Sequence, residues 1–148
     1  MPDHLSAGEF WRPILHRLLN RRFLPCLSIK QPWPYRIFYE GKDVENRSWE
    51  TKFRRAFLVH AGKTPDCPKK YWTHRDDMPL GCICGLAYIT DCVDQWASEW
   101  FVGPYGFVLD HRKLLFQTPL PYRGQLGFFD VPCELVREAL NKRLIQIH

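Results

Sequence analysis

Residues 27–62, LSIKQPWPYRIFYEGKDVENRSWETKFRRAFLVHAG, decide the fold of this chain. The stretch opens on a short apolar run that predicts a strand and stops at the polar residues before Trp33. Pro34 suits the first turn of a helix because its φ is fixed and no backbone donor is lost there. We expect that helix to span residues 35–40 and to end at Gly41, the residue type that best tolerates a left-handed cap. Residues 56–60 then predict a further strand.

Between these apolar runs lies a dense polar segment, residues 42–49, which reads KDVENRSW. In an extended backbone its side chains alternate between two faces. Glu45, Arg47 and Trp49 then share one face with Asp43. So much charge and hydrogen-bonding capacity between two apolar strands is unusual for a plain scaffold, and it marks this segment as functional.

Three blocks in this region resemble the core of the activating signal cointegrator homology (ASCH) family, and two later blocks resemble the end of its bacterial single-domain members. In order they are LSIKQPW (27–33), GKDVENRSW (41–49), LVHAGK (58–63), VGPYGFVL (102–109) and RGQLGFFDVP (123–132). The resemblance covers roughly residues 26–131. It implies a PUA-like fold, a small β-barrel surrounded by short helices, with a cleft lined by the polar segment.

The rest of the chain also predicts an α+β fold of one domain. Length and a hydrophobic content of 45% suffice for one buried core. We expect residues 24–131 to form the PUA-like domain, 1–23 an N-terminal helical extension and 132–148 a C-terminal helix packed on the same domain. Further strands are expected at 82–91, 105–109, 114–116 and 126–131, short helices at 68–75 and 133–144, and a proline-bracketed loop at 119–121. The regular N-terminal helix is expected to begin at residue 12 or 13, because Pro13 would break a helix that began earlier.

The formal net charge of +5 and a pI near 9.0 favour an anionic partner such as RNA. No apolar run is long enough to span a membrane. The N-terminal segment has no signal-peptide pattern, so we expect a cytoplasmic protein. Its six cysteines lack paired spacing and predict reduced, mostly buried thiols rather than a zinc site. The apolar stripe of the N-terminal helix indicates docking on the barrel, with a dimer contact or an RNA-facing arm as alternatives.

Lys42 and Glu45 are the candidate catalytic residues. A lysine buried beside a carboxylate can act as a proton donor or, if its pKa falls, as a base or nucleophile. Arg47 offers the bidentate recognition of phosphate. The alternative is that these three side chains form a salt-bridge network that ties the helix to the barrel.

The candidate RNA-binding residues lie at predicted strand ends and loops, where a site rim commonly forms. Trp33 and Tyr105 are candidates for stacking a base, although core packing is the alternative for both. His60 ends a strand, and a lone histidine there is more often structural than catalytic. With Arg47, the RNA-binding set is Lys30, Gln31, Trp33, Lys63, Tyr105 and Arg123.

Function remains open between three classes at this point. The resemblance implies an RNA-binding protein with a basic cleft, and one branch cleaves single-stranded RNA with magnesium, which would be held loosely through carboxylate and substrate phosphate. A second branch hydrolyses acetylated cytidine nucleosides with a lysine that matches Lys42 and a threonine nucleophile three residues later. Here Glu45 stands at that position and cannot supply a hydroxyl. The third class is an interaction module without catalysis.

Overall fold

The computed structural model of the protein describes residues 4–143, except the side chains of Tyr71 and Arg75. Among these residues it contains both α-helices and β-strands, so the α+β prediction is confirmed. In chain order the elements are α1 (Ala7–Leu18), β1 (Phe23–Ile29), α2 (Trp33–Tyr39), β2 (Val44–Arg47), β3 (Ala56–Ala61), β4 (Cys82–Val93), β5 (Tyr105–Leu109), β6 (Leu114–Pro121), β7 (Phe128–Pro132) and α3 (Cys133–Asn141), with 3-10 turns at Lys69–Tyr71 and Arg75–Asp77.

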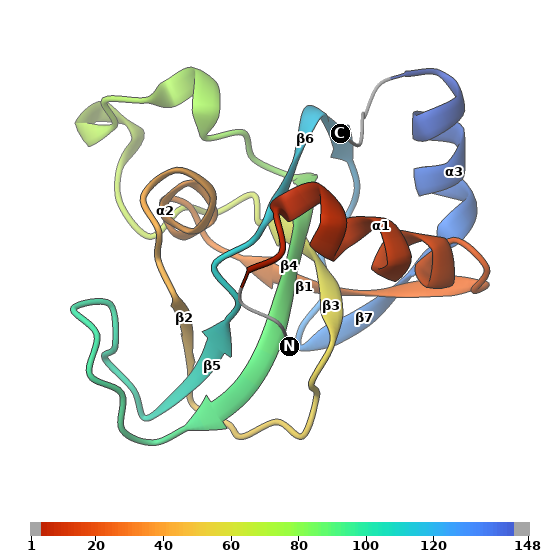
Figure 1. The fold of residues 1–148 in the computed structure, drawn as a ribbon. Coiled ribbons are helices and arrows are strands. Elements are labelled where there is room, and N and C mark those ends of the chain that lie inside the picture. Colours follow the sequence, from red (N-terminus) through yellow and green to blue (C-terminus); the bar gives the residue numbers. More distant parts are fainter. Residues whose placement is uncertain (1–3, 144–148) are drawn as a thin grey trace.

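The strands form one curled sheet in the order β2-β5-β4-β3-β1-β7, with β6 paired to β4 (Figure 1). β1 and β3 run parallel, and every other pair is antiparallel. The parallel pair places Ser28 beside His60 and Leu27 beside Val59. A parallel pair needs a long crossover, and this crossover carries α2 and β2. The functional segment is therefore part of the connection between the two central strands.

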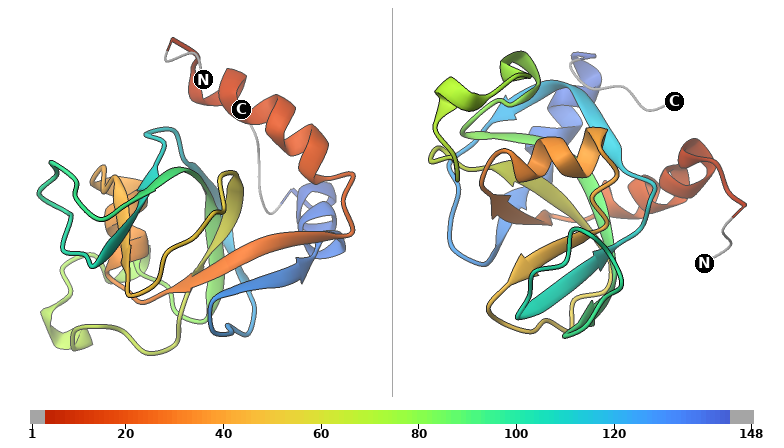
Figure 2. Two further views of the ribbon diagram at one scale, coloured as in Figure 1. Left: turned by 90° about the horizontal axis from the view of Figure 1, so that it is seen from below. Right: turned by 90° about the vertical axis from the view of Figure 1, so that its left-hand side faces the viewer.

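β4 makes the sheet curl, because it pairs with different strands along its length. Its first half pairs with β3 and β6, and its second half pairs with β5 after a register shift between Ile89 and Asp91. Such bulges bend a strand and increase its twist. Figure 2 shows the resulting curvature, with α1 and α3 together on the β1–β7 side and α2 on the other side. Within the described residues the sheet approaches a barrel without closing, since β2 and β7 are its edges.

Two hydrophobic clusters lie on opposite faces of this sheet, as the period of two along a strand requires. The outer cluster joins α1 and α3 to residues such as Cys26 and Leu58. The inner cluster contains the alternate neighbours Leu27, Phe57 and Val59, together with Ile37 of α2. The inner cluster therefore fixes α2, and with it the start of β2, against the inside of the sheet.

α1 begins at Ala7, five or six residues before the start at residue 12 or 13 that Pro13 predicted. Ser6 caps it, accepting a hydrogen bond from the Glu9 amide, while the Glu9 carboxylate accepts one from the Ser6 amide. This capping box stabilises the first turn, and burial of Phe10 and Trp11 anchors that turn on the sheet. Pro13 stands inside the helix. The predicted start of the helix was wrong because it took account of Pro13 but not of the capping box at Ser6 and Glu9.

Other boundaries also differ from the prediction. The segment expected as a helix at 68–75 forms only the two 3-10 turns, and β6 continues through the proline-bracketed segment to Pro121. Prolines are tolerated at a sheet edge, where a missing donor costs nothing. Pro132 caps α3 rather than starting it, and the predicted end of that helix at Leu144 lies outside the described residues. None of the helices within residues 4–143 is long and apolar enough to cross a membrane.

Candidate functional site

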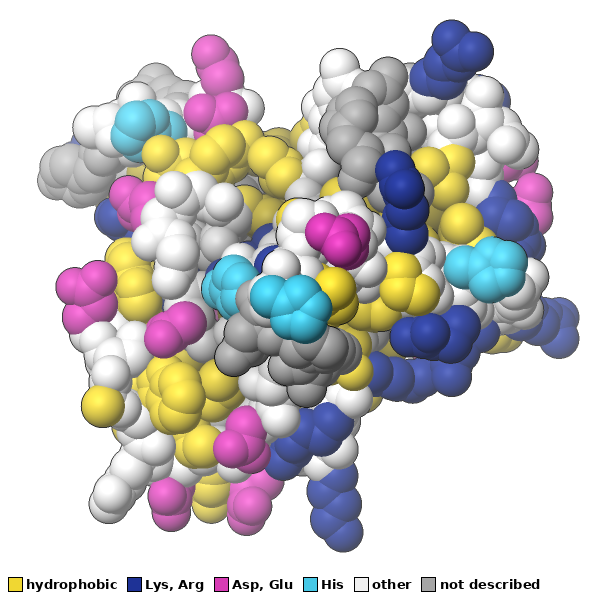
Figure 3. All heavy atoms as spheres, in the orientation of Figure 1, with side chains coloured by type: hydrophobic (Ala, Val, Ile, Leu, Met, Phe, Trp, Pro, Cys, Tyr) yellow, Lys and Arg dark blue, Asp and Glu magenta, His cyan; other side chains and the backbone are white. Residues whose placement is uncertain are grey.

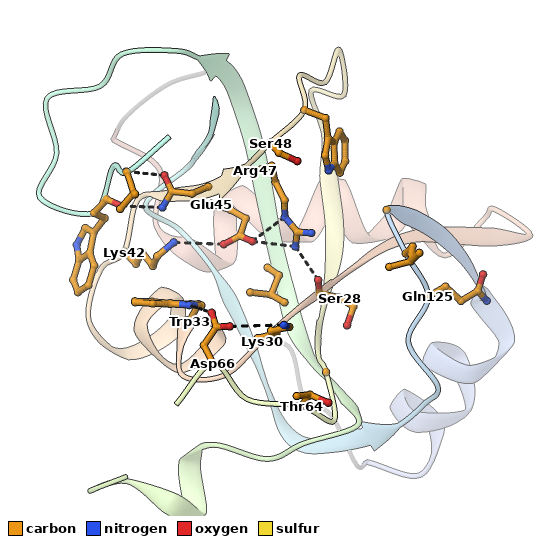
Figure 4. A pocket seen from close by; sticks show the side chains of 18 of the residues that line it. Ser28, Lys30, Trp33, Lys42, Glu45, Arg47, Ser48, Thr64, Asp66 and Gln125 are labelled. Atoms are coloured by element: carbon orange, nitrogen blue, oxygen red, sulfur yellow. Dashed lines mark hydrogen bonds and ion pairs between the residues drawn. The ribbon is translucent and has the colours of Figure 1, made fainter. Parts of the chain in front are cut away.

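A cleft of about 890 Å³ opens where β1, α2, β2 and the loops after β3, β4 and β6 meet (Figure 4). Its walls combine basic, acidic and aromatic side chains. The charged residues are Lys30, Lys42, Glu45, Arg47, Lys63, Asp66 and Glu99, and the indoles are those of Trp33, Trp49 and Trp100. Pockets of this size with a few convergent polar groups are the usual form of a ligand site.

A chain of ions crosses the floor of the cleft from Lys42 through Glu45 to Arg47 (Figure 4). Lys42 Nζ lies 3.5 Å from Glu45 Oε1. Arg47 binds the other carboxylate oxygen, with Nε and Nη2 each 3.0 Å from Oε2. Arg47 Nη2 also donates to the Ser28 carbonyl at 2.8 Å. Both oxygens of Glu45 thus bind cationic side chains, and this ion chain joins β2 to β1 through the bond from Arg47 to Ser28.

Lys42 is the most enclosed member, with 2% of its surface exposed. Its Nζ also donates to the Val44 carbonyl and lies 5.6 Å from the centre of the Trp33 ring. Burial lowers the pKa of Lys42, because removal from water disfavours the charged form, while Glu45 acts in the opposite direction. The predicted salt-bridge network is therefore present, and it lies on the floor of the cleft.

Trp33 forms a fixed aromatic wall. Its Nε1 donates to Asp66 Oδ2 at 2.6 Å, and Lys30 Nζ lies 3.9 Å from Asp66 Oδ1. The Asp66 amide also donates to the Gln31 carbonyl. These contacts hold the loop after β3 against the start of α2, so that indole, carboxylate and exposed ammonium are side by side at the mouth (Figure 4).

The loop before β5 supplies the opposite wall and is held by β2. Asp43 accepts hydrogen bonds from Trp96 Nε1 at 3.2 Å and from Ser98 Oγ at 2.6 Å. Asn46 donates to the Trp100 carbonyl at 3.0 Å and accepts from the amides of Val102 and Gly103 at 2.9 and 3.0 Å. Trp100 thereby lines the cleft although nothing in its local sequence marks it.

We expect Asn46→Ala to loosen this wall. The variant removes an acceptor for two amides and a donor to one carbonyl, and we expect it to lower the free energy of unfolding by about 1–2 kcal/mol. Hydrogen exchange at the Val102 and Gly103 amides should accelerate. Asn46→Asp is the matched control, since it keeps the acceptor and should keep most of the protection. Unchanged exchange in Asn46→Ala would show that Asn46 does not hold the loop.

A second cavity of about 780 Å³ adjoins the cleft and shares Ser28, Gly62 and Lys63 with it. His60 lies on its inner side, 1% exposed, with Nδ1 2.9 Å from Ser28 Oγ and Nε2 2.7 Å from the Tyr122 carbonyl. Because a carbonyl only accepts, Nε2 carries the proton, and Nδ1 accepts from the Ser28 hydroxyl. Arg123 also lines this cavity.

His60 makes the stability depend on pH. Burial lowers its pKa, with the bond to Tyr122 acting in the opposite direction. Below about pH 6.5 the unfolded chain gains a proton on this side chain that the folded protein does not bind. We therefore expect the free energy of unfolding to fall as pH drops from about 6.5, and His60 to contribute no pH dependence above that. Urea titrations of the protein and of His60→Gln should show a weaker acid dependence in the variant; equal dependence would contradict this.

Of the nine residues predicted from the sequence, six line the cleft: Lys30, Trp33, Lys42, Glu45, Arg47 and Lys63. Arg123 reaches only the adjoining cavity. Gln31 is 1% exposed and its amide is used internally, donating to the Pro79 carbonyl and accepting from the Tyr35 amide. Tyr105 pairs with Arg47 across β5 and β2 and does not line either cavity.

Sequence reasoning did not select Ser28, Asp66 or Trp100. Ser28 could have been found from its alternation with Leu27 and Ile29, which places its side chain on a different face. Asp66 and Trp100 reach the cleft through loop contacts that no local pattern encodes. Asp43 and Asn46 were noted only as polar members of the segment, and the structure shows them holding a wall.

The residues present do not suit a resident magnesium ion. Glu45, the carboxylate on the floor of the cleft, has both oxygens bound to cationic side chains. Within residues 4–143 no three His, Cys, Asp or Glu side chains gather in a metal-binding arrangement. The six cysteines are free thiols, four of them buried.

Comparison with known proteins now gives the family. The ASCH domain family matches residues 27–113, which is more than half of the chain and contains the floor and most walls of the cleft. A comparison with curated proteins gives no match. Among solved structures, an ASCH protein from Zymomonas mobilis is similar at 14% identity, with a TM-score of 0.51, over 82% of this chain and 96% of that one. The barrel-like fold expected from the sequence is confirmed by this likeness. The chain belongs to the ASCH domain family.

Proposed function

We propose that the protein binds single-stranded RNA in the cleft, with an unstacked base against the indoles and the phosphates on the cations at the rim. The observation that supports this most is the combination of Trp33 and Trp100 with Lys30 and Lys63 around one opening. Sequence-specific RNA recognition relies on bases splayed from a single strand onto aromatic side chains. A cleft about 890 Å³ in volume admits a nucleotide, whereas a duplex keeps its bases inside.

Residues at the rim of the cleft and residues on its floor have different roles in this proposal. Lys30 has 59% of its side chain exposed, so its ammonium group can move to bind a phosphate without breaking a buried contact. Arg47 is 21% exposed and faces the cleft from the floor, where its remaining donors suit a base edge or a phosphate. Trp33 needs no reorientation, because Asp66 already holds its indole.

Cleavage of the bound RNA is the second candidate function, favoured by the position of Lys42 and Glu45 on the floor of the cleft. An ammonium there stabilises negative charge on a phosphoryl group, and a carboxylate acts as a general base. Both groups are bound to each other in this structure, so cleavage requires that RNA displace part of the ion chain. Any magnesium ion would arrive with the phosphates.

Deacetylation of acetylated cytidine remains the rival from a different class. Glu45 replaces the hydroxyl nucleophile that this activity uses three residues after the lysine. The two classes differ in their response to salt, because phosphate contacts make affinity fall steeply with ionic strength and an uncharged nucleoside gives little slope. The decisive assay therefore measures binding and turnover of both ligands.

The experiment titrates a single-stranded oligoribonucleotide at several salt concentrations. Lys30→Ala and Lys63→Ala should each weaken binding evenly across sequences and reduce the salt slope by about one unit. The matched control is Arg17→Ala with Arg21→Ala. Arg17 in α1 and Arg21 in the loop after it are exposed and line neither cavity. Figure 3 shows that basic side chains also gather outside the cleft, on the right of the molecule in that view. Binding that depends on the control pair and not on the lysines would reject the cleft. The same samples with magnesium and RNA, and with acetylated cytidine, report both reactions.

A further inference from the structure

Ser28 and His60 lie side by side on neighbouring strands, at the border of the two cavities. The parallel register of β1 and β3 pairs them, and their side chains meet at 2.9 Å. Tyr122 fixes the ring from the other side through the 2.7 Å bond to Nε2. A hydroxyl that donates to an imidazole nitrogen, with the imidazole oriented by a third group, is the arrangement of an activated nucleophile.

We propose that Ser28 is a nucleophile and His60 its general base, and that this pair acts on a small carboxylic ester held where the two cavities join. Neither residue belongs to the RNA-binding rim, so the inference goes beyond the proposed function. Ser28 lines both cavities, whereas His60 lines only the second one and is almost fully buried. The hydroxyl therefore faces a substrate while the base is shielded from water.

Two glycines lie against the Ser28 hydroxyl, and the cationic side chains of Arg47 and Lys63 line the cleft that Ser28 also lines. A Cβ atom built on Gly62 lies 3.3 Å from Ser28 Oγ, and one on Gly124 lies 3.0 Å from it, so glycine at both positions keeps side-chain atoms away from the nucleophile. Arg47 binds the Ser28 carbonyl, and Lys63 lines both cavities. Positive charge at this place stabilises the oxyanion that forms when a hydroxyl attacks a carbonyl.

The reaction balances without a cofactor. Ser28 Oγ bonds to the ester carbonyl carbon while its proton passes to His60 Nδ1. The bond from that carbon to the alcohol oxygen then breaks, and the proton on Nδ1 moves to the leaving alcohol. Water attacks the acyl-serine and gives a proton to Nδ1. Release of the carboxylic acid returns that proton to Ser28 Oγ. Throughout, the other ring proton stays on Nε2, which donates it in a hydrogen bond to the Tyr122 carbonyl, whose dipole favours the transient imidazolium.

The test uses p-nitrophenyl acetate as the ester and a fluorophosphonate as a covalent probe, each with the full chain. We expect one acyl or phosphonyl group per molecule, located at Ser28 by peptide mass mapping. Ser28→Ala should lower the rate of acylation by about 10²-fold or more. Thr118→Ala is the control, because Thr118 carries an exposed hydroxyl on β6, lines neither cavity and should leave the rate unchanged.

His60→Gln separates catalysis from structure. Glutamine can keep a bond to each of Ser28 and Tyr122, but it is not basic, so the thermal unfolding midpoint should change little while acylation falls as far as in Ser28→Ala. If that variant does not fold, Gly62→Ala replaces it, since it leaves both side chains intact and places a methyl group beside the hydroxyl; a fall in acylation is expected. Label on other residues, or a rate unaffected by Ser28→Ala, would overturn the proposal.

Discussion

Glu45→Ala is expected to lower the free energy of unfolding by about 3–5 kcal/mol. The substitution leaves Lys42, which is 2% exposed, without its ion-pair partner, and it removes the carboxylate that Arg47 binds. A buried ion pair contributes little net stability when intact, but an unpaired buried charge is costly. Urea unfolding at neutral pH measures the loss directly.

Two variants make this prediction specific. Glu40→Ala removes the exposed carboxylate that pairs with Arg36 one helical turn away, and it should cost no more than about 0.5 kcal/mol. Lys42→Met combined with Glu45→Met removes both buried charges, and it should recover much of the stability lost in Glu45→Ala. A loss in Glu45→Ala as small as that in Glu40→Ala would mean that the floor of the cleft is hydrated and that the ion chain does not hold it.

Trp33→Ala is expected to weaken single-stranded RNA binding by about 1–3 kcal/mol, the range for loss of one base–aromatic stack. The indole lies at the cleft mouth beside the cations, and Asp66 holds it in place before RNA arrives. Fluorescence anisotropy with a labelled oligoribonucleotide gives the affinities. The loss should persist at high salt, because stacking does not depend on counterion release as phosphate contacts do.

Trp33→Phe tests whether the ring face or its hydrogen bond matters. Phenylalanine keeps an aromatic face but cannot donate to Asp66, so most of the affinity should remain if stacking dominates. Trp72→Phe is the control elsewhere in the fold, since Trp72 packs with Tyr35 and Met78 in a separate cluster. Equal losses in Trp33→Phe and Trp33→Ala would assign the effect to Asp66 and the loop that it holds.

Much of this architecture was readable from local signals. Pro34 lies in the first turn of α2, and Gly41 follows its end with a φ of +69°, although the helix spans Trp33–Tyr39 and not the expected residues 35–40. The apolar runs predicted six of the seven strands within the described residues, all except β2. Alternation from Val44 placed Glu45 and Arg47 on a common face, and these two now bind each other on the cleft floor. Signals of this kind need only neighbouring residues.

What the sequence could not supply depends on contacts between distant segments. Gln31 looked like a rim residue, yet Pro79, far along the chain, supplies the carbonyl that draws its amide inward. Trp100 lines the cleft because Asn46, far away in the sequence, binds its carbonyl and holds its loop. Ser28 and His60 are 32 positions apart, and only the parallel register of β1 and β3 brings them together. The register between two strands that do not follow each other in the sequence is set by the packing of the whole core, so no local pattern reveals it.

The central claim, that RNA occupies this cleft, is tested most directly by the six indole N–H signals in a nitrogen–proton correlation spectrum during an RNA titration. We predict that the signals of the cleft tryptophans, Trp33, Trp49 and Trp100, shift with a common affinity. Trp11, fully buried on the core-facing side of α1, and the buried Trp72 should stay in place. Movement of the Trp11 or Trp72 signal while the three cleft signals remain fixed would contradict the account.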